Sequence, residues 1–180
     1  MDEIKKLVSE VADELVALRR DFHQHPELGY QEQRTASIVE EALRSYGLTE
    51  VGRVTQTGVS ALLKGGRPGP VLLLRADLDA LPVAEASGLP YASQKPGVMH
   101  ACGHDGHTAI LVMAAKILSS LKDRLQGSIK FVFEPNEEEV GALAMIEAGV
   151  MENPKVDAAA GLHLWAPLPV GRIAVDPGAC

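Results

Sequence analysis

Metal-binding side chains are concentrated in one short stretch of the chain. Residues 99–107 read MHACGHDGH, in which histidines, a cysteine and an aspartate are separated by small residues. Cys102 and His104 flank a single glycine, a spacing that lets both side chains reach one ion from an extended loop. Thiolate and imidazole are ligands that suit zinc and its borderline neighbours. The stretch therefore predicts a metal site, whereas each residue alone has an ordinary structural interpretation, such as a buried cysteine or a helix-capping Asp105.

Three other segments carry similar side chains where strands are expected to end. Asp77 and Asp79 follow the apolar run VLLLRA, three glutamates at 137–139 follow IKFVFE, and His163 lies near the end of DAAAGLHL. In an open α/β sheet, ligands bind in the crevice beyond the carboxyl ends of the strands. We therefore expect these groups and the cysteine–histidine cluster to share one edge of the sheet.

The acidic run EPNEEEVG has two interpretations. Glutamates in the first turn of a helix are favoured by its dipole and are often simply solvated. Adjacent carboxylates also repel one another unless a cation lies near them. In the second interpretation, one glutamate binds the metal and its neighbour is the general base for the bound water. His163, taken alone, could be either a ligand or a structural histidine. His104 or His107, taken alone, would more often be a surface residue in the first turn of a helix than a ligand.

Hydrophobic periodicity predicts the elements that position these residues. An apolar stripe from Ile4 to Phe22 predicts one N-terminal helix, and a second helix is expected from Glu32 to Tyr46, ended by Gly47. The turn composition of GGRPGP predicts that strands at 59–64 and 70–75 pair as a hairpin.

Strand and helix patterns alternate along the remaining chain. The other expected strands cover 50–55, 127–134, 157–164 and 171–176, and the other expected helices cover 105–121 and 140–151. This alternation predicts an α/β layered fold with a mixed sheet.

Composition excludes several classes of protein. The chain of 180 residues has a formal net charge of −7 and only 4% aromatic residues, which argues against a nucleic-acid-binding surface. The longest apolar run, AILVMAA, is too short to cross a bilayer, and the charged N-terminus does not resemble a signal peptide. Cys102 and Cys180 imply no disulfide framework. We expect a cytoplasmic enzyme that binds neither nucleic acid nor membranes.

Five motifs, taken together, resemble the M20 metallopeptidase family. They are RRDFHQHPELGYQEQRT (19–35), RADLDALP (75–82), MHACGHDGHTA (99–109), FVFEPNEEEVGA (131–142) and GLHLWAPLPVGRIAV (161–175). The most similar branch is its amidohydrolases, which include hippurate hydrolase, indole-acetyl-amino-acid hydrolase, N-acyl-amino-acid deacylases and related carboxypeptidases. The resemblance covers nearly the whole chain.

The resemblance implies roles for individual residues. The positions that match ligands of a two-metal site are Cys102, His104, Glu138 and His163. Glu137 matches the general base, and Asp79 matches an aspartate that orients a ligand. The implied cofactors are two divalent ions, either zinc, manganese, cobalt or nickel, with the thiolate mildly favouring zinc. His23 and His25 match the N-terminal motif without an implied catalytic role, and a structural anchor between helix and loop is favoured for them.

The resemblance also implies a fold and a domain organisation. The fold is a three-layer α/β/α catalytic domain of the zinc-exopeptidase type with a mixed sheet, incomplete in this chain. Residues 1–180 match the N-terminal part of that domain. The lid and dimerisation domain, and the C-terminal part with a further histidine ligand, are absent. The full-length form is expected to be a homodimer. The chain departs from the branch at Glu134, Asn136 and Glu139, where glutamine, alanine and glycine are usual, so the site electrostatics should differ.

The implied activity is hydrolysis of the amide bond of an N-acyl amino acid or a small peptide with a free carboxylate. In this hypothesis a metal-activated water attacks the carbonyl and Glu137 is the general base. One alternative is a metal-binding or storage module, which would need Glu138 and His163 but not Glu137. Another is an inactive fragment of such an enzyme.

Overall fold

A mixed sheet organises the chain, and the computed structural model describes residues 2–175. The strand order is β1-β2-β4-β3-β5. The strands are β1 (Thr49–Arg53), β2 (Val59–Lys64), β3 (Arg67–Asp77), β4 (Gln126–Glu134) and β5 (Ala158–Gly161). β1, β2 and β4 pair antiparallel, whereas β4, β3 and β5 run parallel to one another.

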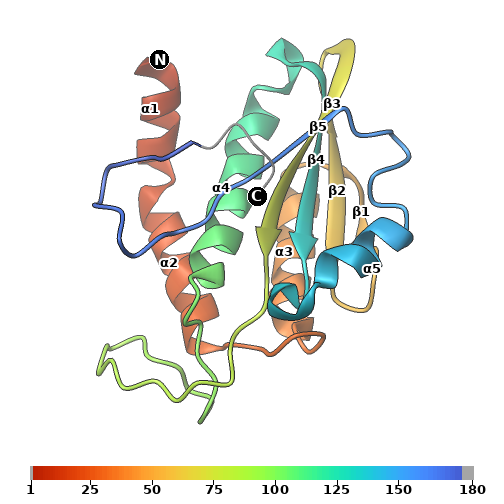
Figure 1. Cartoon of the computed structure of the whole chain (residues 1–180). Coiled ribbons are helices and arrows are strands. Elements are labelled where there is room, and N and C mark those ends of the chain that lie inside the picture. Colours follow the sequence, from red (N-terminus) through yellow and green to blue (C-terminus); the bar gives the residue numbers. More distant parts are fainter. Residues whose placement is uncertain (1, 176–180) are drawn as a thin grey trace.

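Helices cover both faces of the sheet unequally. Helices α2, α3 and α4 pack on one face, and the short α5 lies on the other (Figure 1). The helices are α1 (Asp2–Glu10), α2 (Ala12–Gln24), α3 (Gln33–Ser45), α4 (His104–Ser120) and α5 (Gly141–Glu147), with short 3₁₀ turns η1 (Lys122–Arg124) and η2 (Glu137–Glu139). Within residues 2–175, no helix combines the length and apolar character needed to cross a bilayer. The predicted α/β fold with three layers and a mixed sheet is confirmed.

The main hydrophobic core lies between the sheet and the three helices on its larger face. Phe22 of α2, Val39 of α3 and Val112 of α4 are fully buried there against Phe131 and Phe133 of β4. A smaller cluster on the opposite face contains Leu73, Val132, Met145 and Val150. Because side chains of a strand alternate between faces, the continuous apolar run in β4 supplies both cores.

The predicted hairpin between 59–64 and 70–75 is wrong. β2 pairs antiparallel with β4, with Val59 opposite Phe133, and β3 pairs parallel with β4, with Leu74 opposite Phe131. β4 therefore lies between two strands that are neighbours in the sequence. β4 has apolar residues on both faces and is buried best in the sheet interior, while the crossover from β3 through α4 to β4 places α4 on the larger face.

Several predicted elements differ in extent from the structure, among them the strand expected at 157–164, which ends at Gly161. The N-terminal helix is interrupted at Val11, and α1 has no buried residue. The helix expected at 140–151 ends at Glu147. Residues 171–175 form no strand, and residue 176 lies outside the described part. A strand requires a neighbouring strand to satisfy its main-chain groups, and none lies beside this segment within residues 2–175.

The parallel strands bring the predicted site residues to one edge of the sheet. β3 ends at Asp77, β4 at Glu134 and β5 at Gly161, all pointing the same way. Helix α4 begins at His104 near the same edge (Figure 1). The shared edge expected from the sequence is therefore present.

Lys130 of β4 attaches the irregular connection between α5 and β5 to the sheet by hydrogen bonds. The residue is only 6% exposed, and its ammonium group donates hydrogen bonds to the carbonyl oxygens of Val150 (2.9 Å), Glu152 (2.7 Å) and Pro154 (3.1 Å). Burial lowers the pKa of this lysine. The contacts satisfy three carbonyls in the connection between α5 and β5, so one side chain from β4 attaches this loop at three points.

Replacing Lys130 by methionine should destabilise the protein. Lys130→Met keeps the apolar part of the side chain but leaves the three carbonyls without their donor, so we expect the free energy of unfolding to fall by about 1–3 kcal/mol. Urea denaturation measures this change. Lys64→Met is the matched control, because the Lys64 side chain on β2 is 61% exposed. A Lys130→Met variant as stable as this control would show that the loop does not need the ammonium group.

Candidate metal centre

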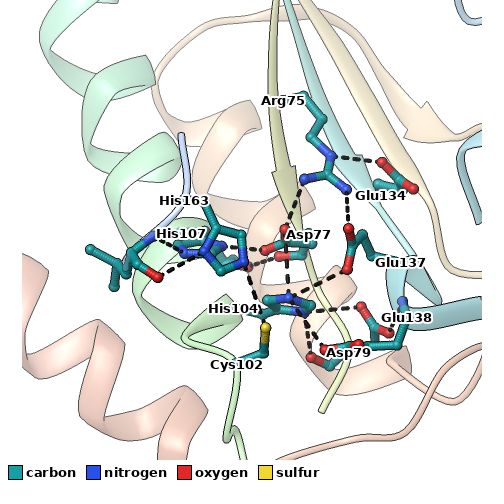
Figure 2. Close-up of polar contacts among 12 residues, drawn as sticks. Arg75, Asp77, Asp79, Cys102, His104, His107, Glu134, Glu137, Glu138 and His163 are labelled. Carbon is teal, nitrogen blue, oxygen red and sulfur yellow. Dashed lines mark hydrogen bonds and ion pairs between the residues drawn. The ribbon is translucent and has the colours of Figure 1, made fainter. Parts of the chain in front are cut away.

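Side chains from several elements face one another at the edge where the parallel strands end. Figure 2 shows residues from β3, the start of α4, the turn after β4 and the segment after β5 around His104. Ligand atoms of Cys102, His104 and His163 all lie within 4.8 Å of one another, as do those of His104, Glu137 and Glu138. Ligand atoms around a tetrahedral zinc ion are separated by roughly 3.3–3.8 Å, given its bond lengths. The structure therefore brings the predicted ligands together.

Gly103 allows Cys102 and His104 to face the same point. Its φ is +90°, in the left-handed region that side chains with a Cβ rarely adopt. A Cβ at this position would lie 3.4 Å from the Cβ of Leu164. The sharp turn at Gly103 ends the loop and starts α4, so the thiol and the imidazole that flank it point inward.

His104 has one occupied and one open ring nitrogen. Its Nδ1 lies 2.9 Å from the main-chain oxygen of Asp79 and 3.2 Å from Asp79 Oδ1, so Nδ1 carries the proton and donates it. Among the described residues, the buried Nε2 has no hydrogen-bond partner. It lies 3.6 Å from Glu137 Oε2 and 3.9 Å from Glu138 Oε1. A buried, unpartnered imidazole nitrogen facing carboxylates fits a metal ligand, because leaving it unpaired is costly.

Asp79 has the geometry of the orienting aspartate that the family resemblance implies. Besides contacting His104, its Oδ2 accepts a hydrogen bond from the main-chain N–H of Glu138 at 3.2 Å. Burial raises the pKa of Asp79, but the hydrogen bonds from His104 and from the main chain at Glu138 and Glu137 outweigh it, and the net shift is downward. Asp79 therefore stays ionised while its carboxylate contacts the ring of His104 and the main-chain N–H of Glu138, two of the predicted ligands.

The thiol of Cys102 lies in negative surroundings. Its Sγ is 3.5 Å from His163 Nε2. Burial raises the pKa of Cys102 to about 12, and the nearby Glu138, Glu137 and Asp77 act in the same direction. A thiol in such surroundings becomes a thiolate only when a cation offsets the carboxylate charge. Deprotonation of Cys102 would therefore require a cation beside its thiol.

Arg75 was not identified from the sequence, yet it links the acidic residues. Its Nε lies 2.7 Å from Glu134 Oε2, its Nη1 2.9 Å from Asp77 Oδ2, and its Nη2 3.4 Å from Glu137 Oε1. One guanidinium thus compensates three carboxylates, including the unusual Glu134. The signal available in the sequence was the i, i+2 spacing of Arg75 and Asp77, which places both side chains on the same face of β3.

The buried His107 differs from His104 because both of its ring nitrogens are engaged. Nδ1 lies 2.7 Å from Asp77 Oδ1, and Nε2 accepts a hydrogen bond of 2.8 Å from the main-chain N–H of Leu164. Ligand atoms of Asp77, His104 and His107 also lie within 4.8 Å of one another. However, His107 would have to give up one of its contacts to bind a metal. Interpreting His104 and His107 as surface residues is wrong, since both are fully buried.

His23 and Asp105 form a separate network that joins α2 to the start of α4. His23 Nδ1 lies 2.7 Å from Asp105 Oδ2 and its Nε2 3.2 Å from Glu85 Oε1, while Arg19 Nε lies 2.8 Å from Asp105 Oδ2. Asp105 does not cap α4, because it lies within the helix and faces His23. His23 is therefore placed as an anchor between helices and loop. His25, directly after α2, contacts the main chain of Asp21 in that helix, at 2.9 Å.

Comparison with known proteins places this site in a family. The model of peptidase family M20/M25/M40 matches residues 73–178, which include every predicted ligand. The chain belongs to this family. A solved structure described as a dinuclear metal binding peptidase from the M20 family, the YxeP protein of Bacillus subtilis, is 42% identical. It superposes with a TM-score of 0.88, covering 93% of this chain and 47% of that one.

Curated relatives of this M20 chain are longer than the chain itself. An N-acyl-L-amino acid amidohydrolase of Geobacillus stearothermophilus is 51% identical over 179 residues, which cover 98% of this chain and 48% of the relative. The thermostable carboxypeptidase 2 of Saccharolobus solfataricus is 43% identical over 185 residues, 99% of this chain and 47% of the relative. The M20 chain thus spans about half the length of the curated relatives it matches.

The anchor around His23 should be sensitive to pH. The hydrogen bond to Asp105 raises the pKa of His23, and the hydrogen bond to Glu85 raises it further. Burial and the nearby charge of Arg19 lower it, but the net shift of the pKa is upward. The ring of His100 is also buried, and it lies close enough to Asp105 and His23 to interact electrostatically with both. Because the folded pKa exceeds the unfolded value near 6.5, the stabilisation is complete below pH 6.5 and is lost as the pH rises through the folded pKa.

His23→Gln should therefore lower the free energy of unfolding by about 1–3 kcal/mol near pH 6 and by less near pH 9, as measured by urea denaturation at both pH values. His25→Gln is the control, because within residues 2–175 the polar contacts of its ring are with Asp21 of the adjacent helix α2. A His23→Gln effect that grows with pH would contradict this assignment.

The turn that carries the glutamates contains backbone strain. Asn136 (φ +52°) and Val140 (φ +65°) flank η2 and both adopt the left-handed conformation. Asparagine tolerates this region, but a β-branched residue does not. The Val140 side chain is 71% exposed, so packing gives it little compensation.

Glycine at position 140 should relieve this strain. Val140→Gly is expected to raise the free energy of unfolding by about 1 kcal/mol, because glycine adopts a positive φ without the steric cost. Thermal or urea unfolding gives the sign. Leu143→Gly, a change at an exposed position inside α5, should instead cost about 1 kcal/mol. Destabilisation by both substitutions would show that the conformation at Val140 is not strained.

Proposed function

We propose that this M20 chain forms the ligand-bearing part of a metal-dependent amidohydrolase that cleaves N-acyl amino acids or small peptides with a free carboxylate. The observation that carries the proposal is the open, buried Nε2 of His104, which faces carboxylates on one side while the thiol of Cys102 and the imidazole of His163 lie on the other. Names of relatives support the same reaction class, since they include an amidohydrolase and a carboxypeptidase.

We further propose that residues 1–180 are the N-terminal part of the catalytic domain, and that a longer chain adds a lid and dimerisation domain and a further histidine ligand. The chain spans about half of its curated relatives. All four residues of the edge strand β5 are exposed, and Trp165 and Ile173 beyond it are 67% and 89% exposed. Apolar groups exposed next to a strand edge that is unpaired within residues 2–175 favour further chain packing there.

The residues proposed to hold two divalent ions are Cys102, His104, Glu138 and His163. A thiolate, two imidazoles and a carboxylate form a donor set that accepts zinc, manganese, cobalt or nickel, with zinc mildly favoured by the thiolate. When bound, such ions polarise a carbonyl oxygen and lower the pKa of water at the site. The chain's own contribution is to hold the donors in place, through Asp79 for His104 and through Gly103 for Cys102.

Glu137 is proposed as the general base. Its Oε2 lies 3.6 Å from His104 Nε2, so it borders the proposed ions, and Arg75 holds its other oxygen at 3.4 Å. In the proposed reaction Glu137 removes a proton from the attacking water as the water oxygen bonds to the amide carbon. It then delivers that proton to the amine nitrogen as the carbon–nitrogen bond breaks. The products are a carboxylic acid and an amine.

A cavity beside the proposed ligands supports this class of substrate. It is bounded by Cys102 and His163 and by the segment after them, with the apolar Trp165 and Leu168 and the guanidinium-bearing Arg172 among its lining residues. An apolar wall suits an acyl group, and a guanidinium suits a carboxylate. The preferred acyl group and amino acid would also depend on the remainder of a longer chain. Its cytoplasmic location and homodimeric state are further parts of the proposal.

Replacing Glu137 by glutamine tests the mechanism. In the form of the protein that shows turnover, Glu137→Gln should lower kcat by about 10²–10⁴-fold without loss of bound metal, because it removes the base but none of the proposed ligands. Hydrolysis of a panel of N-acyl amino acids and elemental analysis provide the two measurements. Glu139→Gln, at the exposed neighbour in the same turn, should leave both unchanged. Undiminished turnover in a metal-loaded Glu137→Gln variant would exclude Glu137 as the base.

The same measurements separate the alternative functions. A metal-binding or storage module would contain metal and show no hydrolysis, in this chain and in a longer form alike. An inactive fragment would bind metal weakly alone, whereas a longer form would be active. Loss of metal in Glu138→Gln together with unchanged metal in Glu137→Gln favours the division of roles proposed above.

A further inference from the structure

We propose that His107 is a positioning residue that sets the orientation of His163 by holding the main chain at Leu164. This inference extends the proposed function, because it matters for catalysis only if His163 binds metal. It assigns a role to a buried histidine that is excluded from the ligand set by its own contacts. The geometry itself is independent of any bound ion.

A continuous series of contacts connects β3 to His163 through His107 (Figure 2). Asp77 at the end of β3 lies 2.7 Å from His107 Nδ1, and His107 Nε2 lies 2.8 Å from the Leu164 nitrogen. His163 Nδ1 then donates to the carbonyl oxygen of Leu164 at 2.7 Å. The two histidines thus contact the two main-chain polar groups of the same residue.

These contacts determine the tautomers of both rings. A main-chain N–H can only donate, so His107 Nε2 is the acceptor and the proton is on Nδ1, facing Asp77. A main-chain carbonyl can only accept, so His163 carries its proton on Nδ1. In the neutral ring of His163 the nitrogen without a proton is therefore Nε2, which faces Cys102, 3.5 Å from Sγ. Holding Leu164 selects the ligand nitrogen of His163 as well as its direction.

The segment that carries His163 has few other attachments. Pairing of β5 with β3 ends at Gly161, opposite Arg75. Leu162 and Leu164 beyond it are 44% and 49% exposed. The ring of His107 also packs edge-on against His163, with centroids 4.5 Å apart. Without His107, the main chain after β5 would lack its nearest buried attachment, and His163 would sample other orientations.

Gly106 completes the docking position for Leu164. A Cβ at this residue would lie 2.7 Å from Leu164 Cδ1, so the absence of a side chain lets the leucine lie against the first turn of α4. Leu164 is therefore held by its N–H on His107 and by its side chain over Gly106. Both contacts come from the turn of α4 that also carries His104, which couples the positions of the two proposed ligands.

Two substitutions at position 107 separate its contacts. His107→Asn places an amide nitrogen near the position of Nδ1 and keeps the contact with Asp77, but it is too short to reach Leu164. His107→Gln places an amide oxygen near the position of Nε2 and keeps the acceptor for the Leu164 N–H. The probes are Zn²⁺ and Co²⁺ alone, with affinity measured by competition with a chelator. We expect His107→Asn to weaken binding by about 10–100-fold and His107→Gln to restore most of it.

A double-mutant cycle with His163→Ala tests whether His107 acts through His163. If it does, adding His107→Asn to His163→Ala should cause no further loss of metal affinity. A general structural role would instead make the two losses additive, with an equal loss in His107→Gln, and either result would overturn the proposal. Urea denaturation of the metal-free variants verifies that each is folded.

The wild-type chain provides a test that needs neither a variant nor a metal. Long-range ¹H–¹⁵N correlation spectra should show the Nδ1–H tautomer for His107, and hydrogen exchange should show a protected Leu164 amide. An Nε2–H tautomer, or a rapidly exchanging Leu164 amide, would overturn the proposal even if every variant failed to fold. If the wild type has this tautomer and protection but a longer form of the chain shows no metal-dependent hydrolysis, the positioning role of His107 stands and the proposed hydrolase function fails.

Discussion

Carboxylates from β3 and from the turn after β4 can share one sheet edge only because the guanidinium of Arg75 lies among them. Two like charges 4 Å apart repel by about 4 kcal/mol at an effective dielectric constant near 20. Arg75 contacts Asp77, Glu134 and Glu137 at once, and His104 lies beside the same group. This compensation is incomplete around Cys102, whose pKa is raised by burial and by neighbouring acids. A divalent cation bound there would complete it.

The histidines of this region differ in role because their ring nitrogens have different hydrogen-bond partners. His104 donates from Nδ1 to Asp79 and leaves Nε2 open, as expected of an oriented ligand. His107 uses both nitrogens, for Asp77 and Leu164. His23 uses both nitrogens as well, for Asp105 and Glu85. The same side chain thus serves as a proposed ligand, a proposed positioning group and an anchor between helices.

Departures of this chain from the usual pattern of its branch are explained in part by the structure. Glu134 forms an ion pair with Arg75, which adds one negative charge to the network without contacting the proposed ligands. Asn136 occupies a left-handed position that asparagine tolerates, and its main-chain N–H donates to Glu32 at 2.9 Å. For Glu139, which is exposed, nothing in the structure explains the choice of residue.

Local patterns predicted the type of most elements well. The helix periodicity at 105–121 corresponds to α4 and the apolar run at 127–134 to β4. They did not predict that β4 would lie between β2 and β3, because turn composition reports a reversal of the chain and contains no information on which strand fills the space beside it. For the same reason a strand was expected at 171–176, where a suitable pattern has no neighbouring strand within the described residues.

The sequence by itself determined the family, the fold class and the side chains available as ligands. Ligand spacing, strand ends and helix periodicity are local properties, and they are visible in a linear order of residues. Only the tertiary structure decided which histidine nitrogen is open, which carboxylate Arg75 neutralises, and how His163 is held. These outcomes depend on contacts such as that between His107 and Leu164, which are 57 residues apart. Packing of distant segments, which a local pattern does not contain, sets such contacts.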